Sequence, residues 1–264
     1  MKIWEARRLH KVMTAGRTHP LVLECMHSND DGHSHFQTMV VKAVGLPEVT
    51  GKSLFNEFFG NLLAREFGLF TPSPGLVNLS ERFVRLANAS ALLKQYQLQV
   101  RSGLGVGCEF FDQGFTNVVP GAFLTTEELT QATLLYAFDL LIQNPDRTAR
   151  KPNCAFQSQQ LIAYDFEMGF SFLLPILGKA APAWQVSAHG IGAQHVFHPA
   201  LQGRDLDWQP FITTLRQLTK QRLEQLQDEL PAAWHPLTEA VGAHLFEAQS
   251  QCDTMEAELQ RSLL

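Results

Sequence analysis

The sequence has few cysteines and few tyrosines, and both shortages narrow the classes of protein to which it can belong. Its four cysteines, Cys25, Cys108, Cys154 and Cys252, include no pair in the CxxC spacing that is typical of zinc and redox sites. We therefore expect thiols rather than a disulfide framework. Three tyrosines stand against 19 phenylalanines, so most of the aromatic surface is expected in the core.

Long apolar runs and a strong net charge are also absent. No apolar stretch reaches the roughly 18 residues of a membrane-spanning helix. The first residues lack the apolar segment of a signal peptide, so we expect a cytoplasmic protein without a membrane span. The net charge of −5 argues against direct binding of nucleic acid. A chain of 264 residues with 45% hydrophobic residues is enough for one large domain or two joined lobes.

The first part of the chain reads as rich in strands. Residues 21–26 and 36–43 are short apolar runs on either side of a polar turn that contains Gly32, which predicts a β-hairpin. A helix is expected over residues 53–67, where apolar residues recur at helical spacing before Gly68. Further strands are expected over residues 73–77, 83–86, 97–100 and 106–111.

The second part reads as mostly helical. A helix capped by Thr126 is predicted over residues 127–143. Two more are predicted over residues 208–229 and 237–259, with Pro231 and Pro236 as breakers between them. We therefore predict an α+β protein with a small β-rich lobe over residues 1–107 and a larger helical lobe over residues 108–264.

A polar loop follows the first of these helices. Residues 144–153 read NPDRTARKPN, and a short apolar strand over residues 161–164 then leads into Asp165. Phosphoryl transfer from ATP needs a carboxylate to orient or deprotonate the acceptor hydroxyl, and an amide oxygen with a second carboxylate to hold magnesium. The alternative is ordinary turn chemistry, because Asn-Pro-Asp is frequent in turns and Asp often caps helices.

Lys42 ends an apolar run within a predicted strand. A lysine at such a position can bind the α- and β-phosphates of a nucleotide. The alternative is a solvated lysine on an edge strand. Glu57, on the following helix, is a candidate to orient Lys42 through an ion pair. Glu66 is the rival, about two and a half turns later. We prefer Glu57 because it lies nearer the start of the helix.

These elements together resemble the HipA-like kinase family over most of the chain and, more distantly, the phosphatidylinositol 3/4-kinases. The resemblance rests on Val40-Val41-Lys42, on Asn56-Glu57, on GLFTP at residues 68–72, on N-x-D-R-T-x-x-x-P-N at residues 144–153 and on Tyr164-Asp165. The loop pattern is its most specific part, since the H-R-D-x-x-x-x-N loop of ordinary protein kinases has a shorter spacing.

The resemblance implies a two-lobed, protein-kinase-like fold that binds ATP and Mg²⁺. It implies that Asp146 is the catalytic base, that Asn153 and Asp165 are metal ligands, and that Lys42 binds the phosphates.

The resemblance also implies further nucleotide contacts. Cys108, Glu109 and Phe110 would form the inter-lobe hinge against adenine. Ser28 and Gly32 lie in the turn that we expect to cover the nucleotide.

The expected activity is transfer of the γ-phosphoryl of Mg-ATP to a hydroxyl acceptor, with protein Ser/Thr favoured over a lipid headgroup or a metabolite. The alternative is a pseudokinase or nucleotide-binding scaffold that acts through a protein partner. It is motivated by Phe166-Glu167 after Asp165, where relatives carry His-Gly, and by the aspartates of the covering turn. A helical interaction protein without a nucleotide site is the third reading.

Two further motifs carry weaker signals. The glycines of GLGVG at residues 103–107 have a GxGxG spacing followed by a strand, which argues against a dinucleotide-binding loop. His189, His195 and His198 lie in a Gly-, Pro- and Ala-rich segment without an HExxH motif. A loop that covers the cleft is favoured there over a metal site.

Overall fold

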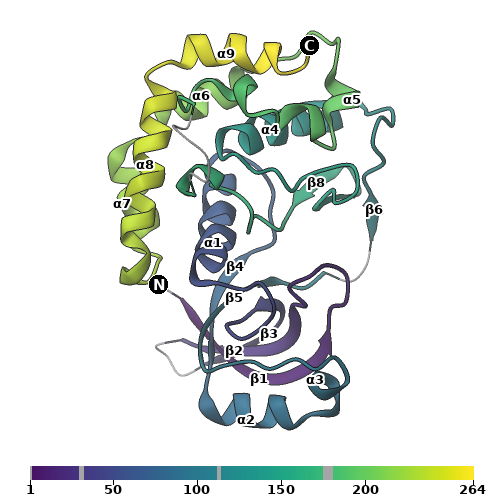
Figure 1. The fold of residues 1–264 in the computed structure, drawn as a ribbon, viewed down its shortest axis with the longest axis vertical. Coiled ribbons are helices and arrows are strands. Elements are labelled where there is room, and N and C mark those ends of the chain that lie inside the picture. The colour runs from purple at the N-terminus through teal and green to yellow at the C-terminus, as the bar shows by residue number, and fades with distance from the viewer. Residues whose placement is uncertain (1, 30–32, 112–113, 175–180) are drawn as a thin grey trace. The chain divides into compact units, whose positions relative to one another are not determined.

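A computed structural model describes residues 2–29, 33–111, 114–174 and 181–264. The chain divides into two compact units (Figure 1). Unit 1 comprises residues 1–58 and 72–112, and unit 2 comprises residues 59–71 and 113–264. The division falls within helix α1 (Gly51–Glu66). The mixture of strands and helices agrees with the predicted α+β class, whereas the two-lobed arrangement and the lobe boundary after residue 107 stay predictions.

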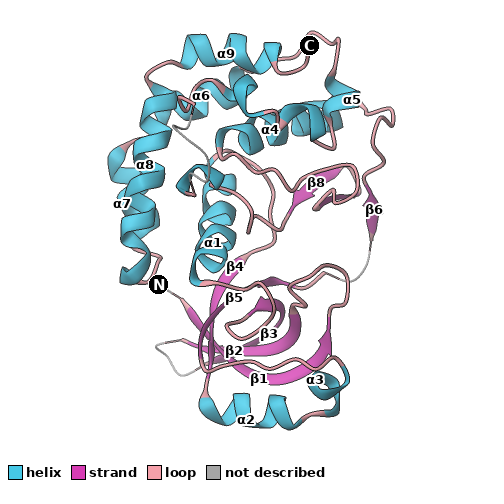
Figure 2. Cartoon of the chain, viewed as in Figure 1, coloured by secondary structure: helices cyan, strands magenta, loops and turns pink. Residues whose placement is uncertain are grey.

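Unit 1 is built around a closed barrel with the strand order β1-β2-β3-β5-β4, drawn in magenta in Figure 2. Its elements are β1 (Ile3–Val12), β2 (Leu21–Ser28), β3 (Ser34–Lys42), β4 (Pro74–Leu79), α2 (Glu81–Ala89), α3 (Ala91–Gln95) and β5 (Gly103–Glu109). Alternate residues of β2, namely Leu21, Leu23 and Cys25, are fully buried in the barrel core. This is the alternation that a strand with one buried face requires.

The predicted hairpin is present. β2 pairs with β3 in antiparallel register, with Leu21 opposite Val41 and Ser28 opposite Ser34. On its other side β3 pairs with β5, where Lys42 faces Val106. Lys42 therefore lies at the end of the hairpin where β2 begins, and Ser28 lies at the opposite end.

The barrel explains the GxGxG motif. A Cβ atom on Gly105 would lie 2.7 Å from the carbonyl oxygen of Lys42, and one on Gly107 would lie 3.0 Å from Cγ2 of Val41. Such a contact at Gly105 is closer than packed atoms tolerate. Gly105 and Gly107 thus allow close packing inside the barrel.

Two predicted strands of unit 1 are wrong. Residues 83–86 belong to helix α2, whose N-cap Ser80 accepts a hydrogen bond from the backbone of Phe83. Residues 97–100 form no strand, because the side chain of Asn88 takes both backbone hydrogen bonds of Val100. A capped helix and a side-chain amide satisfy the backbone where the apolar pattern suggested sheet pairing.

Unit 2 is mainly helical and carries a small sheet in the order β6-β7-β8. Its elements are β6 (Phe115–Asn117), α4 (Thr126–Leu141), β7 (Cys154–Gln157), β8 (Gln160–Ala163), α5 (His198–Leu201), α6 (Gln209–Gln217), α7 (Lys220–Gln227), α8 (His235–Gln249) and α9 (Cys252–Arg261), with short 3₁₀ turns over Ser171–Leu173, Val186–His189, Gly192–Gln194 and Ala232–Trp234. Helix α4 packs against α5, α6 and β8, and α6 packs in turn against α8 and α9. Most of the side chains of α4 are consequently buried.

The two long helices predicted near the C-terminus are each divided. Thr219 caps a new helix, α7, after Leu218, because its side chain accepts a hydrogen bond from the backbone of Arg222. Helices α8 and α9 are separated at residues 250–251, where the N-cap residue Gln251 makes no capping bond through its side chain. Pro236 is not a breaker, since it lies in the first turn of α8, where proline is tolerated.

Among the described residues, no helix is both long and apolar enough to cross a membrane. None of the four cysteines forms a disulfide.

A partly buried histidine closes the C-terminal end of α4. Nε2 of His244 lies 2.8 Å from the carbonyl oxygen of Leu141, and its ring stacks on Phe172 with centroids 3.7 Å apart. The ring therefore satisfies one of the carbonyl groups that a helix end leaves without a partner. Burial is the main reason that the pKa of His244 falls from its ordinary value to about 4.

This lowered pKa predicts a loss of stability in acid. Between about pH 6.5 and pH 4 the unfolded chain binds a proton at His244 that the folded chain does not, so the free energy of unfolding falls as the pH falls. The contribution of this group is at most about 1.4 kcal/mol per pH unit. We expect urea unfolding of His244→Gln to depend less steeply on pH in this range than that of the wild type. The variant His10→Gln, which removes an exposed histidine, should keep the wild-type slope; equal slopes for all three proteins would contradict the assignment.

Candidate active site

The loop of residues 144–153 begins where α4 ends. The N-cap of the helix is Thr125 rather than the predicted Thr126, in a capping box in which Thr125 and Glu128 satisfy each other's backbone groups. At its other end Gln143 takes a left-handed backbone conformation with φ of 50°, and this turns the chain out of the helix. The capped helix and the turn at Gln143 therefore fix the position at which the loop begins.

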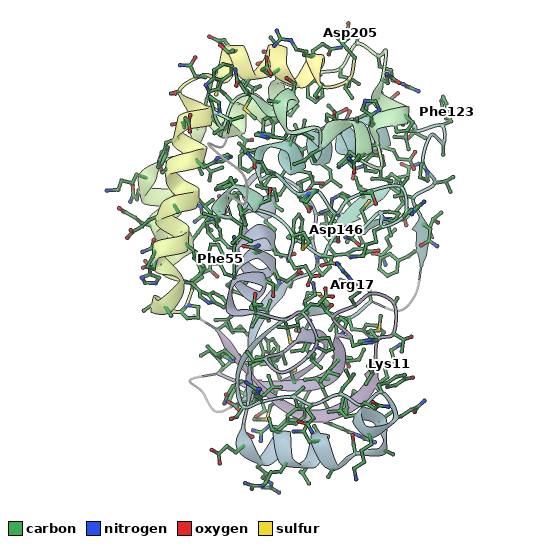
Figure 3. All side chains as sticks on the ribbon, viewed as in Figure 1. Lys11, Arg17, Phe55, Phe123, Asp146 and Asp205 are labelled. Carbon is green, nitrogen blue, oxygen red and sulfur yellow. The ribbon has the colours of Figure 1, made fainter. Side chains whose placement is uncertain are left out.

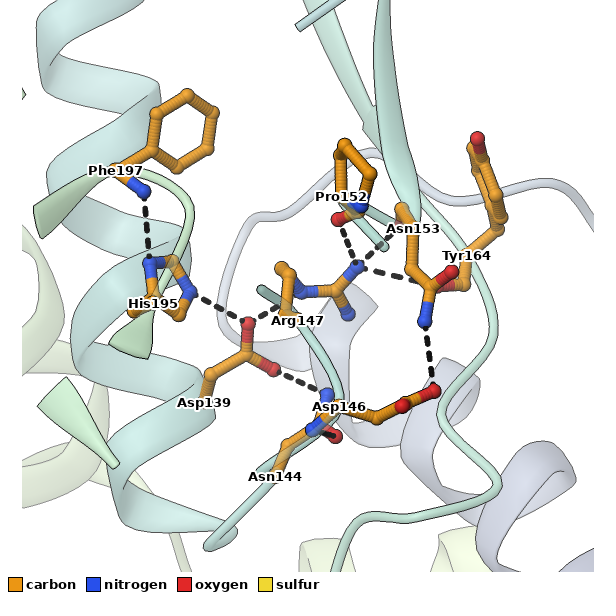
Figure 4. A network of polar contacts seen from close by, with 9 residues as sticks. All are labelled: Asp139, Asn144, Asp146, Arg147, Pro152, Asn153, Tyr164, His195 and Phe197. Atoms are coloured by element: carbon orange, nitrogen blue, oxygen red, sulfur yellow. Dashed lines mark hydrogen bonds and ion pairs between the residues drawn. The ribbon is translucent and has the colours of Figure 1, made fainter. Parts of the chain in front are cut away.

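Polar side chains meet in this loop. Oδ2 of Asp146 accepts a hydrogen bond from Nδ2 of Asn153 at 3.1 Å (Figure 4). It also accepts one from Nζ of Lys151 at 2.7 Å. The backbone N–H of Asp146 donates to Oδ1 of Asn144. The structure therefore brings the candidate base, Asp146, and a candidate metal ligand, Asn153, into direct contact. Lys151 joins them, although the sequence analysis assigned it no role.

Arg147, next in the chain, is completely buried. Its Nη1 donates to the carbonyl oxygens of Asn153 and Tyr164, the latter at 3.2 Å, and lies 3.5 Å from that of Pro152. Nη2 has no hydrogen-bond partner among the described residues. The guanidinium lies over the ring of Phe166, with its carbon 5.0 Å from the ring centre, a favourable cation–π arrangement. One side chain thus holds the backbone just before both candidate metal-binding positions.

The counterion of Arg147 is Asp139, on α4. Its carboxylate is fully buried and accepts hydrogen bonds from Nε of Arg147, from Nδ2 of Asn144 at 2.9 Å and from Nε2 of His195 at 3.1 Å. Nδ1 of His195 accepts the backbone N–H of Phe197. The histidine proton therefore resides on Nε2 and points at Asp139.

These contacts set the charges of the cluster. Burial alone would raise the pKa of Asp139, but the charge of Arg147 and the hydrogen bonds of its partners outweigh burial and hold the pKa below its ordinary value. Burial lowers the pKa of His195. At neutral pH the cluster is thus an ionised Asp139, a charged Arg147 and a neutral His195.

Asp165 follows β8 directly. The backbone N–H of Tyr164 donates to the carbonyl oxygen of Asn153 at 3.0 Å, so the residue before Asp165 is tied to the other candidate metal ligand. Asp165 and Asn153 both take left-handed backbone conformations, with φ of 61° and 47°. Phe166, which follows, is fully buried and packs edge-on against Phe138. The large side chain of Phe166 therefore fills space in the hydrophobic core.

The donor set fits a magnesium ion carried in by a nucleotide. Because Nδ2 of Asn153 is bonded to Asp146, its amide oxygen remains for a cation, and Asp165 supplies a carboxylate. Magnesium typically takes one or two carboxylates from the protein and completes its shell with phosphates and water. Among the described residues, no group of three or more His, Cys, Asp or Glu side chains is placed to hold a metal ion.

Within unit 1, Lys42 and Glu57 form a buried ion pair. Nζ of Lys42 lies 2.9 Å from Oε2 of Glu57, and the two side chains are 10% and 7% exposed. Glu66, the rival considered from the sequence, is bonded instead to Nε and Nη2 of Arg222 in unit 2. The apolar setting of Lys42 in β3 and the proximity of Glu57 to the helix start were the signals that favoured this pairing.

The structure places Ser28, a predicted nucleotide contact, at the end of the hairpin opposite Lys42. Oγ of Ser28 lies 3.2 Å from Oγ of Ser34, at the far end of the hairpin. Gly32 lies outside the described residues. The turn that adjoins Lys42 is the one between β1 and β2, which ends at Pro20 next to Leu21. The sequence analysis missed it because it missed β1.

The predicted hinge residues lie at the end of β5. Cys108 and Glu109 are the last two residues of the strand, opposite Val40 and Met39 of β3. Phe110 follows, and its ring lies under Nζ of Lys11 at 4.7 Å.

A protein-family model described as HipA-like kinase matches residues 7–263. The chain therefore belongs to the HipA-like kinase family, and its class is that of a kinase-type phosphotransferase. Among solved structures, the crystal structure of a Helicobacter pylori proinflammatory kinase, CtkA, is similar, with a TM-score of 0.49 and 11% sequence identity over 95% of this chain and 96% of that chain. The search of curated proteins gave no match.

The buried cluster predicts a large cost for removing Arg147. The variant Arg147→Met would leave the carboxylate of Asp139 buried without its counterion, which typically costs about 3–5 kcal/mol. We expect that loss in the free energy of unfolding, measured with urea. The control Arg216→Met removes an arginine whose ion pair with Asp253 is exposed, and such pairs contribute about 0–1 kcal/mol. Similar losses for the two variants would show that the cluster does not carry the stability assigned to it.

Proposed function

We propose that the chain transfers the γ-phosphoryl group of Mg-ATP to a hydroxyl acceptor. One observation carries the proposal: within a member of the HipA-like kinase family, the Asp146 carboxylate is hydrogen-bonded to the Asn153 amide, and the backbone of Asn153 is bonded to the residue before Asp165. A base and two oxygen ligands for magnesium are thus held by one network. This is the set of groups that phosphoryl transfer requires.

Asp146 would act on the acceptor. In the proposed step, the acceptor oxygen forms a bond to the γ-phosphorus, and the bond from that phosphorus to the β,γ-bridging oxygen breaks, leaving its electron pair on ADP. The acceptor proton passes to the Asp146 carboxylate, which orients the hydroxyl before transfer. The side chain of Asp146 is 22% exposed, so an acceptor can approach it.

We propose further roles for residues in each unit. Asn153 and Asp165 would hold magnesium, which neutralises charge on the phosphates. Lys42, oriented by Glu57, would bind the α- and β-phosphates. The turn of residues 13–20 is a better candidate to cover the phosphates than residues 28–35, because it adjoins Lys42. The segment from Cys108 to Phe110 would contact adenine.

Family membership supports the choice of a hydroxyl acceptor, and we propose serine or threonine of a protein as the first class to test. Autophosphorylation offers a readout that needs no knowledge of the natural acceptor. Each phosphate adds about 80 Da of mass and changes the local charge.

The substitution Asp146→Asn tests this function. It removes the proton acceptor but leaves the phosphate-binding and metal-binding residues in place. We expect phosphoryl transfer, measured as mass gain or as ADP release, to fall by about 10²–10⁴-fold, the usual contribution of a general base. Binding of Mg-ATP, measured by calorimetry, should persist.

The matched control is Asp205→Asn, which changes an exposed aspartate of unit 2 that Figure 3 shows well away from Asp146. It should transfer phosphate at the wild-type rate. Wild-type activity in Asp146→Asn would overturn the role of this residue. Binding of Mg-ATP by the wild type without any transfer would instead support the pseudokinase alternative.

A further inference from the structure

We propose that Lys151 is a catalytic residue that binds the γ-phosphoryl group during transfer. This inference rests on the proposed function and adds to it a residue for the reacting phosphate. Its starting point is the 2.7 Å contact between Nζ of Lys151 and Oδ2 of Asp146, the carboxylate assigned to the acceptor hydroxyl (Figure 3 locates Asp146).

The backbone of Lys151 is fixed while its charged end is accessible. Thr148 and Lys151 exchange backbone hydrogen bonds of 2.9 and 3.1 Å, and Oγ1 of Thr148 also accepts from the N–H of Lys151. The side chain of Lys151, in contrast, is 40% exposed. A flexible four-carbon stem on a fixed backbone lets the ammonium group move by a few ångströms to a ligand.

The ion pair with Asp146 is not needed to hold the loop. A pair this exposed typically contributes only about 0–1 kcal/mol. The loop is already anchored by Arg147, whose guanidinium is completely buried and bonds the carbonyl oxygens of Asn153 and Tyr164. A cation beside the candidate base therefore calls for an explanation other than stability.

The chemistry of transfer supplies that explanation. An acceptor hydroxyl bonded to Asp146 lies about 3 Å from the carboxylate, and its oxygen must lie about 3–3.5 Å from the phosphorus that it attacks. Nζ of Lys151 is already within hydrogen-bond distance of the same carboxylate. A small movement of the lysine side chain would therefore bring its ammonium group to the oxygens of the γ-phosphoryl group. The lysine charge would there stabilise the transferring group, while the bonds, the electron pair and the acceptor proton move as described for Asp146.

This role predicts a specific pattern of nucleotide binding. ADP lacks the γ-phosphate, so Lys151→Met should bind Mg-ADP as the wild type does. The same variant should bind β,γ-imido-ATP, an analogue of ATP that does not transfer its γ-phosphoryl group, more weakly than the wild type does when magnesium is present. Its transfer rate at saturating Mg-ATP should fall by about 10²–10³-fold, as when one preorganised charge-stabilising group is removed. Lys151→Arg should restore part of the rate.

The control is Arg150→Gln, which removes the adjacent exposed cation and should leave both affinities and the rate unchanged. Equal losses of Mg-ADP and imido-ATP affinity in Lys151→Met would show that Lys151 only positions the loop and would overturn the proposal, as would an unchanged transfer rate. Failure of the proposed function itself has a different signature, since the wild type would then transfer no phosphate, whether or not it binds either nucleotide with magnesium.

Discussion

The buried ion pair between Asp139 and Arg147 is the interaction on which the candidate site depends. A carboxylate without solvent exposure is costly unless its charge is matched and its oxygens are hydrogen-bonded. Arg147, Asn144 and His195 together meet that need. In return, the guanidinium of Arg147 is fixed in direction and holds the backbone carbonyls at the positions from which Asn153 and Asp165 project.

This arrangement separates two charged residues that are neighbours in sequence. Arg147 is fully buried and serves the fold, whereas Asp146 is partly exposed and is the residue for which we propose a role in the chemistry. The buried pair resists displacement because losing either partner strands the other charge. The more exposed ion pair of Asp146 with Lys151 can be exchanged for contacts with a ligand at little cost. The candidate site therefore combines a loop backbone that is held rigidly by a buried ion pair with a carboxylate whose contacts a ligand can replace. Such a rigid backbone is what a preorganised site requires.

Much of this site was predictable from the sequence. The loop pattern placed Asp146, Asn153 and Asp165 in order along the chain, and the apolar run before Lys42 marked a lysine in a partly buried strand. The hairpin of β2 and β3 and the start of α1 followed from alternation and helical spacing.

The partners of Arg147 were not predictable, because they are brought together by tertiary folding. Asp139 lies among apolar residues of α4, where a lone acid is the only sequence signal, and His195 lies 56 residues further on. β1 was missed, so the turn of residues 13–20 was missed with it. The helix α2 was mistaken for a strand because its capping serine, Ser80, was not weighed against a short apolar run. The packing role of Gly105 and Gly107 in β5 could not be predicted, because it depends on neighbouring strands of the barrel.

The central claim is that this network binds a nucleotide together with magnesium, and the melting temperature tests it most directly. Wild type and Asp165→Asn would be compared with ATP, with magnesium and with both; asparagine tolerates the left-handed backbone of this position. At a ligand concentration about a hundredfold above Kd, binding stabilises the folded state by about 2.7 kcal/mol. We predict that magnesium increases the stabilisation by ATP in the wild type and that Asp165→Asn loses this increase. No stabilisation of the wild type, or the same magnesium effect in both proteins, would contradict the account.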